Sequence, residues 1–422
     1  MKRNFKSRLN ELRRSGEVQT GSQLAGKLKE LDHEDPFTDL PGRGSIEATP
    51  FGPCYLREIS FSLDHRHGGI DLSGILSCHG KDLSLPARDC TFESFNPEKS
   101  LFLDTETTGL SGGTGTWAFL IGLGWIENSS FLLRQYFLRR PAEERAVLSH
   151  FAQTASRFST LVTFNGKLFD LPLLHTRQIL AGFEKTSPKM HLDLLQCARQ
   201  LWRKRLPSRS LRSIEESLLG LKRYDDIPGA EIPEVYFDYL RRGKTELLKK
   251  VFHHNTLDIL SMVTLLKRVS SLAADRHIEH PAEALSMGRL CLKSGKTDEG
   301  VSFLREAAGS NHSRLAEEAA LELALHHKRE GRWTDAAGIW LELVNNKAAG
   351  TAAYVELAKY YEHRCSRFAE ALSLTEKALE IALLTKPELP GSSEFSLTAL
   401  RHRRSRLIRR SEYLYSPNNP VQ

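Results

Sequence analysis

Between residues 99 and 274, short apolar segments alternate with longer helical ones in an order that few folds share. Three strands are expected first, at residues 101–104, 116–125 and 131–138, and Gly-rich or Asn-Ser turns separate them as in an antiparallel meander. Later elements alternate, namely a helix over 141–158, a strand over 160–164, a helix over 168–181, a strand over 191–195 and a long helical region over 233–274. This order predicts an α/β domain with a mixed five-stranded sheet that begins with the three-strand meander.

The sequence divides into further segments on either side of this domain, which we place at residues 99–272. Residues 1–48 are polar and interrupted by Pro and Gly, so we expect a loosely ordered tail. Residues 49–98 are predicted to form a β-rich extension, because residues 55–63 alternate between apolar and polar side chains. Near its centre, the segment Asp64-His-Arg-His67 is predicted to be a surface turn rather than a metal cluster.

The C-terminal third of the chain is helical and contains a weak internal repeat. Three Gly- or Arg-rich turns recur over residues 280–385, and Trp333 and Phe368 occupy equivalent positions 35 residues apart. A period of about 34 residues with a helix–turn–helix pattern is typical of tetratricopeptide repeats, which stack into a solenoid. Residues 386–422 are predicted to form a basic helix and a disordered C-terminus.

Composition limits where such a chain works and what it binds. The net charge of +7 permits a nucleic-acid partner but does not require one. The six cysteines include no Cys-x-x-Cys pair, which favours reduced thiols in the cytoplasm. The first residues lack the apolar core of a signal peptide, and the most apolar window, residues 117–126, is too short to cross a bilayer, so no membrane is expected.

Two acids at the end of the first predicted strand carry the strongest chemical signal. Asp104 and Glu106 stand two residues apart, and side chains at that spacing point to the same face of a strand. Neighbouring buried carboxylates repel each other, and a divalent cation removes that conflict. Hard oxygen ligands of this kind suit Mg²⁺ or Mn²⁺.

The string Phe102-Leu-Asp-Thr-Glu-Thr-Thr-Gly-Leu110 resembles the first motif of the DEDD superfamily of 3′–5′ exonucleases, which have a ribonuclease-H-like fold. Asp170, at the end of Phe164-Asn-Gly-Lys-Leu-Phe-Asp170, is similar to the acid of the second motif, where it begins a helix. Asp258, at the end of His253-His-Asn-Thr-Leu-Asp258, is similar to the acid of the third.

Further strings narrow the resemblance to the bacterial YprB-type family of ribonuclease-H-like proteins. They are Arg209 to Gly220, Asp226-Ile-Pro-Gly229, Ile232 to Phe237 and His254-Asn-x-x-Asp258, together with the upstream strings Thr49-Pro-Phe-Gly52 and Leu63 to Gly68. With the repeats, they extend the resemblance over most of residues 49–385. The activity of this family is itself inferred from the same motifs. The resemblance therefore implies a fold more firmly than it implies a substrate.

The resemblance implies a two-metal hydrolysis of phosphodiester bonds, with four acids holding two Mg²⁺ or Mn²⁺ ions. These acids are Asp104, Glu106, Asp170 and Asp258. A histidine near the last acid accepts a proton from water, and both His253 and His254 are candidates. We favour His254, because on a helix residues i and i+4 share a face, which places it beside Asp258.

Other candidates concern the substrate. Thr107 and Leu110 correspond to positions where related exonucleases contact the terminal nucleotide, and Asn165 either binds substrate or holds a turn. Asp193 either supports the site or caps a helix. Arg209 belongs to a run of cations that is a candidate phosphate track, made of Arg199, Arg203, Lys204, Arg205, Arg209 and Arg212.

These patterns predict a metal-dependent 3′–5′ exonuclease that acts on a single-stranded 3′ end of DNA or RNA. The alternative is a nucleic-acid-binding or scaffold protein that acts through its repeats on a protein partner, because solenoids usually serve as interaction surfaces. A ribonuclease-H-like endonuclease shares the metal chemistry, but the His-x-x-x-Asp pattern belongs to the exonuclease branch.

Overall fold

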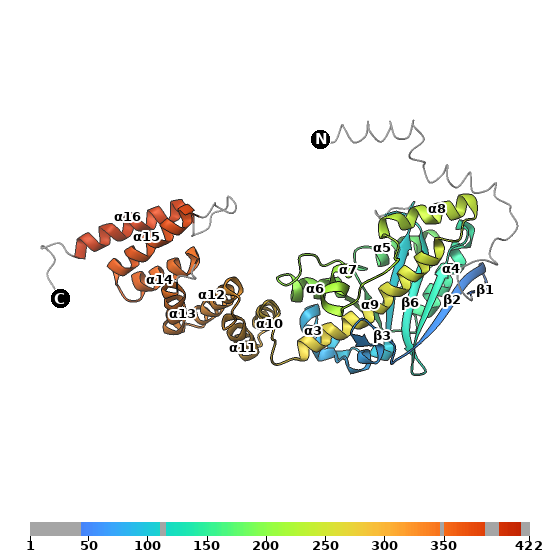
Figure 1. Cartoon of the computed structure of the whole chain (residues 1–422), viewed down its shortest axis with the longest axis horizontal. Coiled ribbons are helices and arrows are strands. Elements are labelled where there is room, and N and C mark those ends of the chain that lie inside the picture. Colours follow the sequence, from blue (N-terminus) through green and yellow to red (C-terminus); the bar gives the residue numbers. More distant parts are fainter. Residues whose placement is uncertain (1–43, 110–114, 347–349, 385–395, 415–422) are drawn as a thin grey trace, which may run out of the picture. The chain divides into compact units, whose positions relative to one another are not determined.

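The structure is a computed structural model that describes residues 44–109, 115–346, 350–384 and 396–414. It contains two compact units that divide between Ala274 and Asp275 (Figure 1). Each unit has its own buried core. The expected polar tail lies outside the described residues up to residue 43, as do residues 385–395 and 415–422 near the C-terminus.

A seven-stranded mixed sheet forms the centre of the N-terminal unit, with the strand order β1-β2-β7-β6-β5-β8-β9. The strands are β1 (Gly44–Thr49), β2 (Gly52–Ser62), β5 (Ser100–Thr107), β6 (Ala118–Glu127), β7 (Ser130–Phe137), β8 (Thr160–Thr163) and β9 (Met190–Asp193). β5, β6 and β7 form the expected antiparallel meander, and β5 then pairs in parallel with β8. The five-stranded core predicted from the sequence is therefore present.

The sheet is larger than predicted because two further strands join it. β2 comes from the predicted N-terminal extension, whereas β1 comes from the end of the segment predicted to be a loosely ordered tail, so that prediction is wrong for residues 44–48. β2 pairs antiparallel with β7 from Tyr55 to Ser62, and β1 pairs with β2 on its outer side. The extension thus continues the sheet beyond β7 instead of forming a separate layer. A five-stranded sheet would have left the edge of β7 unpaired, and the β1–β2 hairpin covers that edge.

Short helices and a two-stranded ribbon complete the extension and the connections of this unit. They are β3 (Arg66–His67), β4 (Ile70–Asp71), η2 (Leu72–Ser77), α3 (Gly80–Ala87), η3 (Cys90–Ser94), η4 (Pro97–Lys99), η5 (Pro141–Glu143), α6 (Leu194–Trp202), α7 (Leu211–Ile214), η6 (Glu215–Leu219) and η7 (Gly229–Glu231). The predicted surface turn at residues 64–67 is wrong at its last residue, because His67 is buried.

His67 is only 4% exposed, and its Nε2 lies 2.7 Å from the Ser261 hydroxyl.

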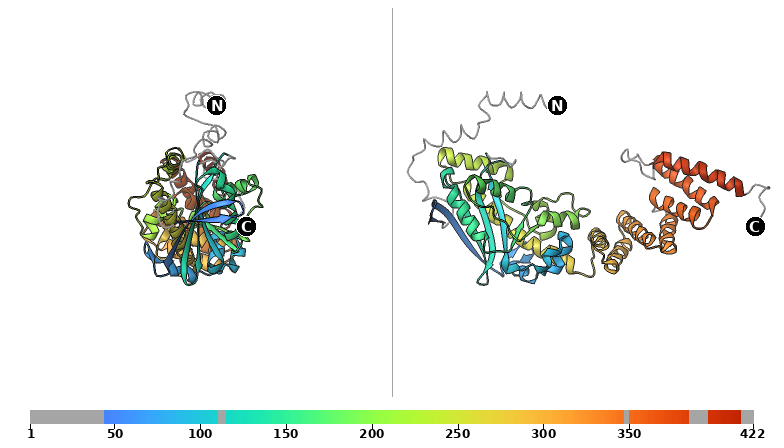
Figure 2. Two further views of the ribbon diagram at one scale, coloured as in Figure 1. Left: turned by 90° about the vertical axis from the view of Figure 1, so that its right-hand side faces the viewer. Right: turned by 180° about the vertical axis from the view of Figure 1, so that it is seen from behind.

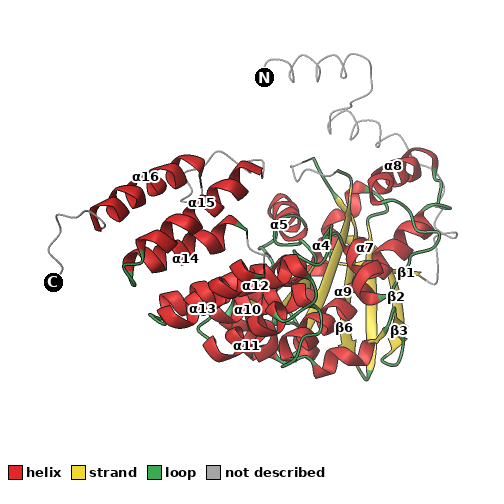
Figure 3. Ribbon diagram, turned by 60° about the vertical axis from the view of Figure 1, so that its left-hand side comes forward, coloured by secondary structure: helices red, strands yellow, loops and turns green. Residues whose placement is uncertain are grey.

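Two helices pack on opposite faces of the sheet, α4 (Glu144–Ala155) and α9 (Leu248–Ala274). Gln135 and Tyr136 are consecutive on β7, so their side chains point to opposite faces. Gln135 donates to Asn255 Oδ1 on α9, whereas the Tyr136 hydroxyl lies 2.9 Å from Thr154 Oγ1 on α4. Figure 3 shows α9 in front of the yellow strands.

Glycines on β6 let α9 approach the sheet closely. A Cβ atom on Gly122 would lie 2.1 Å from Asn255 Oδ1, and one on Gly124 would lie 2.7 Å from Ile259 Cγ2. Both distances are shorter than a Cβ contact allows, so only glycine fits at these positions. The backbone of β6 therefore sets how near the polar side chains of α9 come to β5.

The single helical region predicted over 233–274 is instead two helices. α8 (Ile232–Arg242) ends at Gly243, which has a φ of +67° and whose N–H donates to Tyr239 O. A left-handed residue of this kind ends a helix and favours glycine. α9 then begins at Leu248, while α5 (Asp170–Leu180) lies between β8 and β9 in the sequence.

The C-terminal unit consists of helices, each packed on the next in the sequence (Figure 2). They are α10 (Pro281–Lys293), α11 (Thr297–Ala308), α12 (Ser313–Arg329), α13 (Trp333–Asn345), α14 (Thr351–His363), α15 (Phe368–Leu384) and α16 (Leu397–Leu414). The equivalent residues Trp333 and Phe368 each begin the second helix of a pair, as the repeat predicts.

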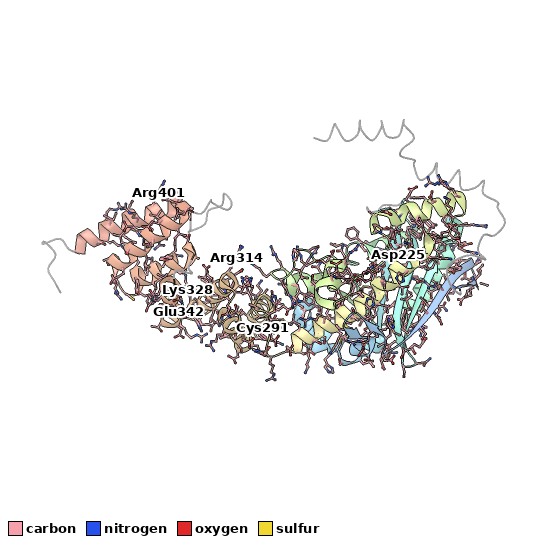
Figure 4. The ribbon with its side chains drawn as sticks, in the orientation of Figure 1. Asp225, Cys291, Arg314, Lys328, Glu342 and Arg401 are labelled. Carbon is pink, nitrogen blue, oxygen red and sulfur yellow. The ribbon has the colours of Figure 1, made fainter. Side chains whose placement is uncertain are left out.

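The basic helix α16 docks through a buried acid. The Glu362 side chain on α14 is fully buried and accepts hydrogen bonds from Arg403 and Arg406. Arg404 pairs with Glu376 on α15, whereas Arg401 is exposed (Figure 4). Within the part of the chain that the structure describes, no helix is long and apolar enough to cross a membrane.

Candidate active site

A cavity of about 640 Å³ opens where β5 ends and α5 begins. Three of the predicted metal-binding acids line it, Asp104, Glu106 and Asp170. Apolar side chains from the β8–α5 connection, from α5 and from α8 also line it. The apolar lining includes Phe164, Leu168, Phe169, Leu173, Ile232 and Pro233. A mostly apolar pocket with a few placed polar groups is typical of a ligand site.

Hydrogen bonds from Thr105 on β5 hold the Asp170 carboxylate of α5 in place. Asp170 is the first residue of α5, and its Oδ1 accepts from the Thr105 N–H at 3.1 Å and from the Thr105 hydroxyl at 2.5 Å. Thr105 stands between Asp104 and Glu106 on the strand. One short stretch of β5 thus supplies two acids and positions the third.

Helix α9 supplies the remaining predicted residues. Asn255 Nδ2 donates to Asp104 Oδ2 at 2.8 Å, while Gln135 Nε2 holds Asn255 Oδ1 at 2.9 Å. His254 and Asp258 lie one turn apart, with His254 Nε2 3.6 Å from Asp258 Oδ2. The neighbouring His253 is exposed. The helix therefore directs His254 toward Asp258, as expected from the i, i+4 spacing, and leaves His253 facing solvent.

Burial raises the pKa values of the three acids that line the cavity, and the charges of neighbouring acids add to the shift for Asp104 and Glu106. Burial raises the pKa of Asp104 well above its usual value, and the charges of Asp258 and Asp170 raise it further. Burial acts in the same way on Glu106, together with the charges of Asp104 and Asp258. The pKa of Asp170 rises to about 6 through burial, although its hydrogen bonds from Thr105 oppose the shift. The carboxylates are thus close enough to destabilise one another's charge.

A buried arginine balances part of this charge. The Arg223 side chain is 4% exposed and pairs with Asp258, Glu215 and Asp226. Burial opposes a charge on Arg223, but Asp258 and Glu215 raise the pKa of its guanidinium above the usual value. Glu215 also accepts from the Ser261 hydroxyl, which contacts His67. A continuous buried polar network therefore runs from the N-terminal extension to Asp258.

The donor set fits a hard divalent cation. Glu106 Oε1 is buried without a hydrogen-bond partner, which is unfavourable unless a cation or a proton satisfies it. Among the described residues, no three Asp, Glu, His or Cys side chains converge as a metal-binding group. A cation held by all four acids would therefore have to compete with Arg223 for Asp258.

Asp193 holds the connection that carries Asn165. Asp193 Oδ1 accepts from the Asn165 N–H at 2.8 Å and from the Leu195 N–H at 3.1 Å, which caps α6. Asn165 has a φ of +68°, and its Oδ1 is buried without a partner at the cavity. Asp193 is thus a helix cap that also fixes the turn before Asp170.

The predicted substrate residues are not all brought together. Thr107 and Asn165 line the cavity. Arg209 is not among the residues that line it, and its Nη1 donates to Pro207 O at 3.3 Å in its own loop. Leu110 lies outside the described residues.

Four residues of the site escape prediction from the sequence: Thr105, Glu215, Arg223 and Asp226. The last three come from the irregular connection between α7 and α8, where no periodicity indicates which side chains point inward. Asn255 follows His254 in the motif, but only the structure shows that it lies on the face of α9 that meets β6.

Comparison with known proteins agrees with this architecture. Residues 101–270 match the RNase_H superfamily, so the N-terminal unit contains a ribonuclease-H-like domain. The chain is also 31% identical over 407 residues to the protein YprB of Bacillus subtilis (strain 168), an alignment that covers 91% of this chain and 95% of YprB. The chain therefore belongs to the YprB-type family of ribonuclease-H-like proteins.

Proposed function

We propose that this protein is a metal-dependent 3′–5′ exonuclease that shortens single-stranded ends of nucleic acid. The observation that carries the proposal is the group of mutually repelling acids at one cavity, where Glu106 Oε1 is buried and unpartnered. Membership of the RNase_H superfamily supports a nuclease in general, and the acid motifs support the exonuclease branch.

Asp104, Glu106, Asp170 and Asp258 would hold two Mg²⁺ or Mn²⁺ ions. When bound, such ions make water a better nucleophile and stabilise the leaving oxygen of a phosphodiester. His254 is positioned to accept the proton of that water, because its Nε2 faces Asp258 from the adjacent turn. Phe164 and Ile232 provide apolar surface in the cavity for a nucleobase, beside Thr107 and Asn165.

The first test uses oligonucleotides of DNA and RNA labelled at the 5′ end, incubated with Mg²⁺, Mn²⁺ or a chelator. We expect a metal-dependent ladder of products that shorten one nucleotide at a time. Circular single-stranded DNA serves as a control and should stay intact, because an exonuclease needs an end. Cleavage of the circle would instead indicate an endonuclease.

Asp104→Asn tests the site itself. We expect this variant to lose cleavage by at least about 100-fold, because it removes a charged ligand for the cations. It should unfold at no lower temperature than the unsubstituted protein in chelator, because it also removes a repelling charge and retains an oxygen for Asn255. Asp71→Asn, at an exposed pair with Arg66, is the matched control and should cleave normally. Normal cleavage by Asp104→Asn would contradict the assignment.

Calorimetric titration with Mn²⁺ gives a readout that does not depend on activity. Binding that is lost in Asp104→Asn would support the acids as cation ligands. The pairing of Asp258 with Arg223 opposes cation binding by that acid, so the titration also tests the alternative, a binding or scaffold role for the repeats. Absence of both Mn²⁺ binding and cleavage, together with retained oligonucleotide binding, would favour that role.

A further inference from the structure

The loop between η6 and η7 places the Asp226 carboxylate against Nδ1 of His254. Both carboxylate oxygens of Asp226 lie 2.9 Å from His254 Nδ1. The side chains are 5% and 15% exposed, respectively, so water competes little for this contact. The other ring nitrogen, Nε2, faces Asp258 Oδ2 at 3.6 Å, which is too long for a hydrogen bond.

Asp226 is itself held in place from two sides. The Ile227 N–H donates to Asp226 Oδ1 at 2.9 Å, and Arg223 Nη1 donates to Oδ2 at 3.1 Å. Arg223 is buried and anchored to Glu215 and Asp258, so it cannot swing away without breaking those pairs. Burial alone would raise the pKa of Asp226, but the contacts with His254 and Arg223 lower it, and the group stays ionised at neutral pH.

An ionised carboxylate only accepts hydrogen bonds, so the contact requires a proton on His254 Nδ1. In the neutral imidazole, the lone pair is then on Nε2, the nitrogen that faces the acid cluster. A neutral imidazole with a free Nε2 is the form that can accept a proton from water. The alternative tautomer would place its N–H toward Asp258 and leave a lone pair opposite Asp226.

We propose that Asp226 is a positioning residue that sets the orientation and tautomer of His254. Its effect on cleavage rests on the proposed function, whereas its effect on the tautomer does not. Asp225 offers a matched control, because it is the adjacent acid but pairs outward with Lys250 on the surface (Figure 4). Its φ is +56°, a conformation that Asn tolerates, so Asp225→Asn introduces no new strain.

The test is two-bond ¹H–¹⁵N correlation spectroscopy of the full chain with ¹⁵N-labelled histidine rings, at alkaline pH where a free imidazole is neutral. The His254 signal is identified by its loss in His254→Gln. We expect the Nδ1–H tautomer in the unsubstituted protein and in Asp225→Asn. Asp226→Asn should shift the population toward Nε2–H, because an amide can donate to Nδ1.

The kinetic arm compares the same variants on the oligonucleotide substrate. Asp226→Asn should lower kcat about 10–100-fold with KM changed less than about twofold, which is typical of losing a group that orients a functional side chain. Asp226→Glu should restore part of kcat, because it keeps a carboxylate. Asp225→Asn should match the unsubstituted protein.

An Nε2–H tautomer in the unsubstituted protein would overturn the proposal, and so would an unchanged tautomer and kcat in Asp226→Asn. If Asp226→Asn does not fold, the spectrum of the unsubstituted protein and the activity of Asp226→Glu decide the question. If no substrate is cleaved by any form, the proposed function fails, while the tautomer still decides for or against Asp226.

Discussion

His67 shows how a single side chain of the N-terminal extension bears on the domain that holds the candidate site. Burial lowers the pKa of this imidazole to about 4 from an ordinary value of 6.5, and the charge of Arg223 adds to the shift. His67 is therefore neutral in the folded protein at pH 5, whereas an unfolded chain would bind a proton there. Its contact with Ser261 joins the extension to α9.

The sign of the pH effect follows from this difference. The unfolded state binds more protons between pH 6.5 and about 4, so His67 makes the folded N-terminal unit lose stability as pH falls through that window. The loss should reach roughly 3 kcal/mol from this group. Hydrogen–deuterium exchange of β5–β7 peptides in denaturant, at a series of pH values, measures it.

The matched control for His67→Gln is His65→Gln, because His65 is exposed two residues away. His67→Gln should flatten the pH dependence, whereas His65→Gln should change it only slightly, since the charge of His65 is the smallest cause of the lowered His67 pKa. The flattening will be partial, since burial also lowers the pKa of His191 to about 4. If stability fell equally with pH in the unsubstituted protein and in both variants, His67 would bind a proton as easily in the folded state as in the unfolded state, contrary to its buried position.

At the scale of elements, the distance between β6 and α9 controls the candidate site. Gly122→Ala would drive a methyl group into Asn255 Oδ1, which also accepts from Gln135. We expect a loss of about 1–3 kcal/mol in the free energy of unfolding, as overpacking usually costs. We also expect reduced cleavage, because Asn255 would leave Asp104.

Thermal unfolding and the oligonucleotide assay measure these two effects. The control is Gly338→Ala on α13, where a Cβ atom meets nothing within 4 Å and alanine favours a helix. That variant should be as stable as the unsubstituted protein or more so. A Gly122→Ala protein with normal stability and normal cleavage would mean that α9 is not held close by β6.

The elements also show what the sequence could and could not predict. The meander β5–β7 and the alternation after it were predictable, because each strand is a short apolar run bounded by turns. The pairing of β2 with β7 was not, because an alternating strand does not reveal its partner. The break between α8 and α9 depends on the left-handed conformation of Gly243, and Arg241-Arg242-Gly243 is a sequence signal for a helix end that the predicted helical region passed over.

The same contrast holds at the candidate site. Asp104, Glu106, Asp170 and Asp258 stand in motifs with fixed spacing on regular elements, so their approximate convergence could be expected from the sequence. Arg223 and Asp226 come from an irregular loop, and only the folded chain shows that they meet α9. Residues recruited from loops are those that periodicity cannot predict.

At the scale of the whole molecule, each unit has its own core, so a substitution can change the free energy of unfolding of one unit without changing that of the other. Glu362→Gln removes the charge that binds Arg403 and Arg406, and the arginines would stay near a buried neutral group. We expect the C-terminal unit to lose about 3 kcal/mol. The N-terminal unit and cleavage should be unaffected, since every acid of the candidate site belongs to that unit.

Exchange mass spectrometry of peptides from each unit distinguishes the two stabilities. Glu376→Gln is the control, because its pair with Arg404 is about half exposed on both sides and should contribute less than about 1 kcal/mol. A fall in the protection of β5–β7 in Glu362→Gln would show that the two units unfold together.

The surplus of acid around Arg223 has a consequence for the order in which ligands bind. Among the described residues of the cavity and its buried network, carboxylates outnumber the guanidinium of Arg223, and they come from Asp104, Glu106, Asp170, Glu215, Asp226 and Asp258. A nucleic-acid strand is itself a polyanion, so this surplus repels its phosphates until cations offset it. Under the proposed function, we therefore expect divalent ions to enter before the strand or together with it, and a chain stripped of them to turn its own substrate away.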